Sequence, residues 1–204
     1  MKLYYLPGAC SLADHITLEW VGAEYEAIQV PRDELKSDWY LAISPGGLVP
    51  ALVDDDGWTL TENEAILHYL AERHPEAELA GTDIRSRAEV NRWLGFLNSD
   101  VHQSFKPIFG ATSFISDEAQ HEDLQQHARE KLGKLFARID ARLQNHPWLA
   151  GEHRSIADPY LFVVLRWARA KQVPLQGLTA LDAFFARMHE DAGVQKALKA
   201  EGIG

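Results

Sequence analysis

The chain has 204 residues, 46% of them hydrophobic and 25% charged, a composition typical of a globular protein with a core of its own. Its net charge of −10 argues against nucleic-acid binding, which requires a basic surface. Its single cysteine excludes an internal disulfide framework and favours a reducing compartment. No apolar run is long enough for a signal peptide or a membrane span, so we expect a cytoplasmic protein without membrane contacts.

Two short strands and a helix are predicted at the start of the chain. Residues 2–6 and 26–30 are rich in strand-forming side chains. Between them, Leu12, Ile16 and Trp20 recur every fourth residue, as in an amphipathic helix that Gly22 would end. A helical connection between two strands implies that the strands pair in parallel.

A hairpin and a second helix are predicted next. Residues 51–53 and 59–60 flank a turn that contains Asp56-Gly57, a pair that favours hairpins. Thr61 and Glu64 have the spacing of a capping box, so a helix is expected from there to about residue 74. The order of elements is therefore βαβ followed by ββα.

The remainder of the chain is predicted to be helical. Residues 75–84 have the composition of a linker, and apolar residues then recur with helical spacing up to residue 204, with Pro107 expected to bend or end one helix. Residues 1–80 carry a net charge of −11 and residues 81–204 a net charge of +1, which suggests two units with different surfaces. The expected fold class is α/β + all-α, with domains at residues 1–77 and 85–204.

Cys10 lies where the first predicted strand turns into the first helix. Ser11 and Asp14 resemble a capping box, which places the helix start at Cys10 or Ser11. A thiol at a helix N-terminus faces free N–H groups and the positive end of the helix dipole, and both favour the thiolate. The alternative interpretation is that Cys10 is a small buried apolar side chain.

Short motifs along the whole chain, taken together, resemble the glutathione S-transferases, and among them the bacterial beta class. They are Tyr5-x-Pro7-Gly8-Ala9-Cys10-Ser11-Leu12, Val49-Pro50-Ala51-Leu52, Leu60-Thr61-Glu62-Asn63-x-Ala65-Ile66, Val101-His102-x-Ser104-Phe105 and Ser155-Ile156-Ala157-Asp158-x-Tyr160-Leu161-Phe162. The resemblance implies that residues 1–77 form a thioredoxin-like domain that binds glutathione. It also implies that residues 85–204 form an all-helical domain that supplies the pocket for a hydrophobic co-substrate.

The resemblance implies a set of glutathione contacts. Pro50 would follow a cis peptide bond, so that the backbone of Val49 pairs with the cysteinyl part of glutathione as an added strand would. Glu62 would bind the γ-glutamyl ammonium, and Asn63, with the N–H groups at its helix start, would bind the α-carboxylate. Lys36 is our candidate for the glycyl carboxylate.

The resemblance also implies catalytic residues. Cys10 would lie beside the glutathione sulfur, with Ser11 and His102 as further hydrogen-bond donors and Ser99, one turn before His102, as a companion. The sequence departs from the family pattern nearby, where Gly95 replaces a common asparagine and Gln103 a frequent lysine. His102 could instead be one of several surface histidines, and Trp167 could line the pocket or pack in the core.

Three activities are compatible with these motifs. The first is conjugation of glutathione to small electrophiles by a homodimeric enzyme without a metal. The second is glutathione-dependent thiol-disulfide reduction through Cys10, and the third is non-catalytic ligand binding. We interpret Tyr4 and Tyr5 as structural residues that face opposite sides of their strand, and Ser155 with Asp158 as a stabilising helix cap.

Overall fold

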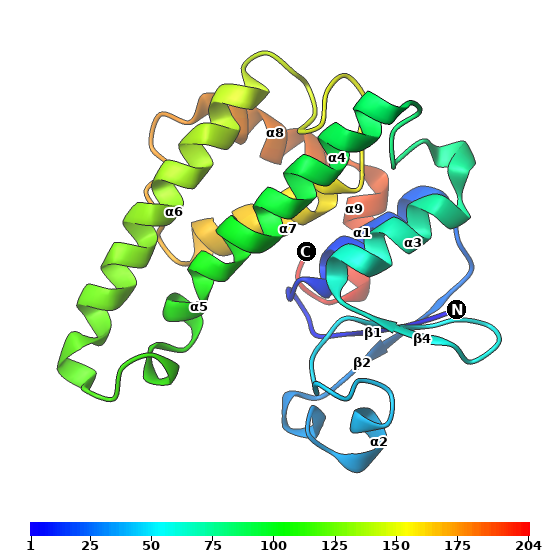
Figure 1. Ribbon diagram of the computed structural model, residues 1–204, viewed down its shortest axis with the longest axis horizontal. Helices are drawn as coiled ribbons and strands as arrows, with labels where there is room; N and C mark the ends of the chain where they lie inside the picture. The colour runs from blue at the N-terminus through cyan, green and yellow to red at the C-terminus, as the bar shows by residue number, and fades with distance from the viewer.

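The computed structural model describes residues 1–204. The first eighty residues contain a four-stranded mixed sheet, which lies beside the helical remainder of the chain (Figure 1). The strands β1 (Lys2–Tyr5), β2 (Glu26–Gln29), β3 (Ala51–Val53) and β4 (Thr59–Thr61) lie in the order β2-β1-β3-β4. β1 pairs in parallel with β2, whereas β3 is antiparallel to β1 and β4. The predicted parallel pair and the predicted hairpin are both confirmed.

Helices cover both faces of this sheet. α1 (Ser11–Val21) and α3 (Asn63–Arg73) pack on one face, where Leu3, Leu18 and Ile66 belong to one apolar cluster. The short α2 (Asp38–Leu41) brings Tyr40 against Tyr4 on the other face. Because successive strand residues point to opposite faces, Tyr4 and Tyr5 lie on opposite sides, as predicted.

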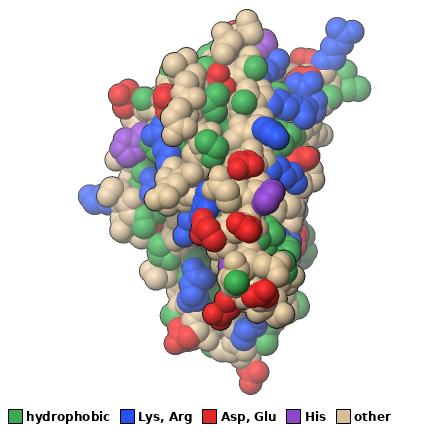
Figure 2. All heavy atoms as spheres, turned by 90° about the vertical axis from the view of Figure 1, so that its left-hand side faces the viewer, with side chains coloured by type: hydrophobic (Ala, Val, Ile, Leu, Met, Phe, Trp, Pro, Cys, Tyr) green, Lys and Arg blue, Asp and Glu red, His purple; other side chains and the backbone are tan.

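All later elements are helical, as predicted. They are α4 (Ile84–Phe96), a π-helical stretch (Leu97–His102), α5 (Gln103–Phe109), α6 (His121–Leu143), α7 (Ala157–Ala170), α8 (Thr179–Glu190) and α9 (Ala192–Ala200), with 3₁₀ turns at Arg32–Glu34, Pro75–Ala77, Ala111–Ser113 and Glu118–Gln120. None of the helices has the length and apolar character of a membrane span. On the face over α5 and α6, acidic and basic side chains are interspersed (Figure 2).

The largest apolar core joins the sheet-containing part to the helical part. Most of α7 is buried, and its Leu161 and Val164 share one cluster with Leu12 and Ile16 of α1 and Leu67 of α3. α1 also packs along α7 and α9 (Figure 1). The first helix, which carries the Cys10 turn at its start, is therefore fixed by the helical part of the chain.

Local details correct some of the expectations. Neither predicted capping box forms. The Ser11 hydroxyl lies 3.4 Å from both the N and O atoms of Leu6. The N-cap residue of α3 is Glu62, whose φ is 74° and whose side chain makes no capping hydrogen bond. Pro107 lies inside α5, which ends two residues later. The π-helical stretch before α5 was not predicted, and such stretches are frequent at functional sites.

Candidate active site

A cavity of about 520 Å³ lies between the start of α1, the cis-proline loop, the start of α3 and the π-helical stretch. Six of the residues singled out from the sequence line it, namely Cys10, Val49, Pro50, Glu62, Asn63 and His102. The Val49–Pro50 peptide bond is cis, as the resemblance implied. Segments that are far apart in the sequence thus contribute to one concave surface.

Three other candidates do not line this cavity. Ser11 is buried and bonds to Leu6. Ser99 is exposed, and its hydroxyl bonds to Gly95 O and to the Asp100 carboxylate, both at 2.7 Å. Lys36 is exposed, and its ammonium donates to Gly46 O at 2.7 Å. A role for these three residues in glutathione binding stays a prediction.

Cys10 is the N-cap residue of α1, and its thiol faces the cis-proline loop. The Sγ atom lies 3.6 Å from the carbonyl oxygen of Val49, to which the S–H donates. Burial, together with the carboxylates of Asp14 and Glu62, raises the pKa of the Cys10 thiol to about 12, although the N–H groups of Ser11 and Cys10 act in the opposite direction. The expectation that the helix terminus keeps Cys10 as a thiolate is therefore wrong, because burial and the two carboxylates favour the protonated thiol.

Glu62 and Asn63 begin α3 at the opposite wall of the cavity. Glu62 is exposed and adopts a left-handed φ of 74°. This backbone conformation costs energy for every residue except glycine, and residues that adopt it cluster at ligand sites. Asn63 is buried, and with its amide nitrogen facing acceptors it donates to Cys10 O at 3.0 Å and to Asp14 Oδ2 at 3.1 Å. The start of α3 is therefore fixed against the start of α1.

His102 lies at the end of the π-helical stretch. Its Nδ1 is 2.6 Å from the hydroxyl of Tyr160, and its ring meets that of Trp167 edge to face with centroids 4.8 Å apart. Burial, and secondarily the charge of Lys106, lowers the pKa of His102 to about 4. The imidazole is therefore neutral at physiological pH and can act as a donor or an acceptor.

The cavity contains functional groups that sequence analysis missed. Asn98 and Lys106 lie four residues before and after His102 and line the cavity, as do Tyr160 and Gln103, of which Gln103 was noted only as a departure from the family pattern. Lys106 is the only lysine or arginine in the lining. The four-residue spacing is a signal that could have identified Asn98 and Lys106 once His102 was chosen, since such residues share one face of a helix.

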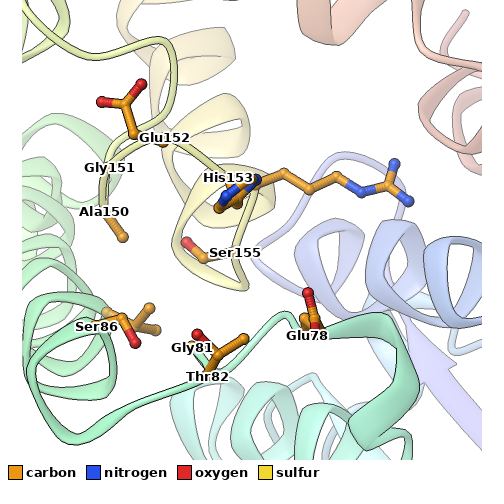
Figure 3. A pocket seen from close by; sticks show the side chains of 11 residues that line it. Glu78, Gly81, Thr82, Ser86, Ala150, Gly151, Glu152, His153 and Ser155 are labelled. Atoms are coloured by element: carbon orange, nitrogen blue, oxygen red, sulfur yellow. The ribbon is translucent and has the colours of Figure 1, made fainter.

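A second cavity, of about 80 Å³, lies between residues 78–90 and the loop of residues 150–155 (Figure 3). The carboxylates of Glu78 and Glu152 lie on opposite sides of it, and Ser155 lies between them (Figure 3). Its volume is too small for a drug-sized ligand. We therefore assign the chemistry to the cavity that contains Cys10, Glu62 and His102.

Two protein-family models match the chain. The model for the glutathione S-transferase N-terminal domain matches residues 9–73, and the model for the glutathione S-transferase C-terminal domain matches residues 104–191. Among curated proteins, glutathione S-transferase GST-4.5 of Xanthomonas campestris pv. campestris is 52% identical over 204 residues, which cover 100% of both chains.

Solved structures agree with these matches over the full chain. A glutathione S-transferase from Xylella fastidiosa superposes with a TM-score of 0.95 at 48% identity, over 100% of this chain and 99% of that one. A sphingomonad glutathione S-transferase complexed with glutathione has a TM-score of 0.89 at 36% identity, over 100% of both chains. A bacterial beta class glutathione S-transferase from Sphingomonas chungbukensis has a TM-score of 0.89 at 37% identity, also over 100% of both chains.

Proposed function

Because the chain belongs to the glutathione S-transferase family, we propose that it conjugates the thiolate of glutathione to small hydrophobic electrophiles. The observation that carries this proposal is the cavity that brings together the Cys10 thiol, the cis Val49–Pro50 peptide, the Glu62 carboxylate and the neutral His102. The similar sphingomonad enzyme was solved with glutathione, which supports the choice of this tripeptide as the ligand.

Each end of glutathione has a complementary group in the cavity. We propose that Glu62 binds the γ-glutamyl ammonium, and that the backbone N–H of Asn63 and the other free N–H groups at the start of α3 bind the adjacent carboxylate, because the Asn63 side-chain amide already donates to Cys10 O and Asp14 Oδ2. The backbone of Val49 would pair with the cysteinyl unit. Lys106 would bind the glycyl carboxylate in place of Lys36, because Lys106 lines the cavity whereas the Lys36 ammonium is bonded to Gly46 O.

The reaction requires glutathione to be held as a thiolate. Its sulfur attacks the electrophile, a sulfur–carbon bond forms, and the leaving group departs with the displaced electron pair. Lowering a thiol pKa by two units needs about 2.7 kcal/mol, whereas an exposed helix terminus gives about 0.3–1 kcal/mol and a charge-assisted hydrogen bond about 1.5–3 kcal/mol. Cys10, protonated at neutral pH, can supply such a bond, and His102 and the N–H of Ser11 are further donors.

The co-substrate would lie on the helical side of the cavity. Phe109 and Phe114 are 51% and 53% exposed, and the Phe109 ring meets that of Trp167 with centroids 5.4 Å apart. Trp167 in turn packs against His102 of the cavity lining, so the Phe109–Trp167 pair favours an apolar, aromatic electrophile on this side. We further propose that the enzyme acts in the cytoplasm as a homodimer, in keeping with its single cysteine and its family.

Substitution of Cys10 separates conjugation from disulfide reduction. With Cys10→Ser, which retains a hydroxyl donor, conjugation of glutathione to an aryl halide should stay within about tenfold of wild type, and with Cys10→Ala it should fall further. Glutathione-dependent disulfide reduction should be absent in both variants. Both assays on purified protein, with calorimetry of glutathione binding, provide the measurement.

Two results would contradict the proposal. Complete loss of conjugation in Cys10→Ser, with glutathione binding retained, would mean that Cys10 forms an obligatory covalent bond. Absence of glutathione binding by the wild-type chain would favour a non-catalytic protein with the fold of a transferase.

A further inference from the structure

A buried carboxylate near the end of the described chain has no part in the chemistry above. Glu201 follows α9, and its side chain is fully buried. Its Oε2 accepts a hydrogen bond from the N–H of Gly8 at 2.8 Å, and its Oε1 lies 3.0 Å from Nδ1 of His15, a side chain that is also fully buried. Because burial of a carboxylate is costly without compensating partners, these contacts indicate a specific role.

Gly8 is held on its other side as well. Its carbonyl oxygen accepts a hydrogen bond from the indole N–H of Trp167 at 2.8 Å. Its φ of +71° is one that L side chains rarely adopt. Both polar groups of this one residue are therefore bound by the helical part of the chain, and Gly8 lies two residues before Cys10.

Neighbouring contacts hold the same segment in place. The hydroxyl of Tyr5 lies 3.5 Å from Ala200 O, and Arg166 donates to Ile203 O at 3.1 Å. The turn itself is closed by a hydrogen bond from Ala9 N to Leu6 O at 3.0 Å. Residues 200–203 thus lie along the turn that ends at the catalytic thiol.

We propose that Glu201 is a positioning residue that orients the Cys10 turn through Gly8 and His15. It touches neither glutathione nor the electrophile in the binding scheme above, and it acts by fixing the backbone on which the thiol is carried. The inference rests on the proposed function in so far as the position of Cys10 matters for the glutathione sulfur. Misplacement of a catalytic group by about 1 Å can cost as much as about a hundredfold in rate.

A matched pair of variants separates positioning from general support of the fold. Asp191 also joins the start of α9 to α1, since its carboxylate accepts from Trp20 Nε1 at 2.7 Å and from Val194 N at 3.0 Å, but it does not contact the Cys10 turn. Glu201→Gln and Asp191→Asn each remove one charge with little change in shape. Both can lower thermal stability, whereas only Glu201→Gln should affect the reactive turn.

The experiment measures steady-state conjugation and the alkylation rate of Cys10, the only cysteine of the chain. Glu201→Gln should lower kcat about tenfold, with the KM for glutathione within about twofold of wild type, because the thiol is displaced while the tripeptide contacts remain. Alkylation by iodoacetamide should become about fivefold faster as water reaches the loosened turn. Asp191→Asn should match wild type in both measurements.

The inference is overturned if Glu201→Gln matches Asp191→Asn in kcat and alkylation. If Glu201→Gln does not fold, Glu201→Asp, which keeps the charge but shortens the side chain that reaches Gly8 N and His15, takes its place, and an alkylation rate equal to that of wild type then overturns the inference. Alkylation is measured without glutathione. A wild-type chain that conjugates nothing would therefore refute the proposed function, and the alkylation rates alone would still decide whether Glu201 positions the turn.

Discussion

At the start of α1, burial and nearby carboxylates act on Cys10 more strongly than the helix terminus does. They raise the pKa of the thiol to about 12 and so outweigh the roughly 0.3–1 kcal/mol by which an exposed helix terminus favours a thiolate. Cys10 is therefore suited to donate its proton in a hydrogen bond to a neighbouring thiolate. The same property argues against Cys10 as the attacking group of a disulfide reductase, because only the thiolate is the nucleophile.

Substitution of Lys106 tests how the glycyl carboxylate is bound. Lys106→Ala should raise the KM for glutathione about tenfold, with a smaller effect on kcat, because one charge-assisted contact to the ground-state ligand is lost. Lys36→Ala should change the KM by less than about twofold, because Lys36 lies outside the cavity lining. Steady-state kinetics with varied glutathione provide the measurement, and the reverse order of the two effects would restore Lys36 as the carboxylate ligand.

Residue chemistry explains which site predictions could be made from the sequence. The types and order of Cys10, Pro50, Glu62 and His102 are recognisable because each has a particular chemical property. Lys36 and Lys106 cannot be distinguished by residue type. The path of the loop that carries Lys36 and the orientation of α5, which carries Lys106, decide which ammonium group reaches the cavity. The four-residue spacing of Cys10 and Asp14 places them on one helix face, but the sequence does not reveal the burial that, with Asp14 and Glu62, raises the pKa of the thiol.

The start of α7 is stabilised by a buried carboxylate. Asp158 accepts hydrogen bonds from Leu149 N at 2.9 Å, Ser155 N at 2.7 Å and Ser155 Oγ at 3.1 Å. It thus links the helix start to the preceding loop, as the Ser155–Asp158 spacing led us to expect. Because α7 carries Tyr160 and Trp167, this link also supports the wall of the cavity behind His102.

Removal of this carboxylate should destabilise the fold. Asp158→Ala would leave two buried N–H groups without partners, at about 1–3 kcal/mol each, so we expect a total loss of about 3 kcal/mol in the free energy of unfolding. Urea denaturation of purified variants measures this loss. Asp33→Ala, at an exposed position, is the control and should change stability by less than about 0.5 kcal/mol. Equal denaturation midpoints for the two variants would contradict the assignment.

Helices and strands followed from periodicity, whereas their ends and irregularities did not. The apolar spacing of Leu12 and Ile16 and the Asp56-Gly57 turn depend on local preferences, which survive in the folded chain. The two predicted capping boxes do not form because tertiary contacts override local sequence spacing. The Ser11 hydroxyl donates to Leu6 O instead, and Glu62, with its positive φ, is the N-cap residue of α3. The π-helical stretch over Leu97–His102 stays helical, so apolar periodicity predicted a helix there without distinguishing its hydrogen-bond pattern.

The whole chain combines an acidic sheet-containing part with a nearly neutral helical part. Trp58 and Ile84 are 49% and 80% exposed, and such apolar surface can be covered by a second copy of the chain. We therefore expect sedimentation at micromolar concentration to give one species of about twice the 22.9 kDa chain mass. A 22.9 kDa species at every concentration tested would contradict the homodimer.

Contacts between distant parts of the chain also constrain how the protein is made. Gly8 and Glu201 are separated by 193 positions. The turn that contains Gly8 and Cys10 is therefore synthesised long before Glu201, whose carboxylate binds Gly8. Nascent chains shorter than 201 residues lack this partner, even when their sheet and first helices have already formed. A premature stop codon or proteolytic trimming within α9 before Leu198 would therefore remove the partner of Gly8 together with Leu198, which belongs to the main apolar core.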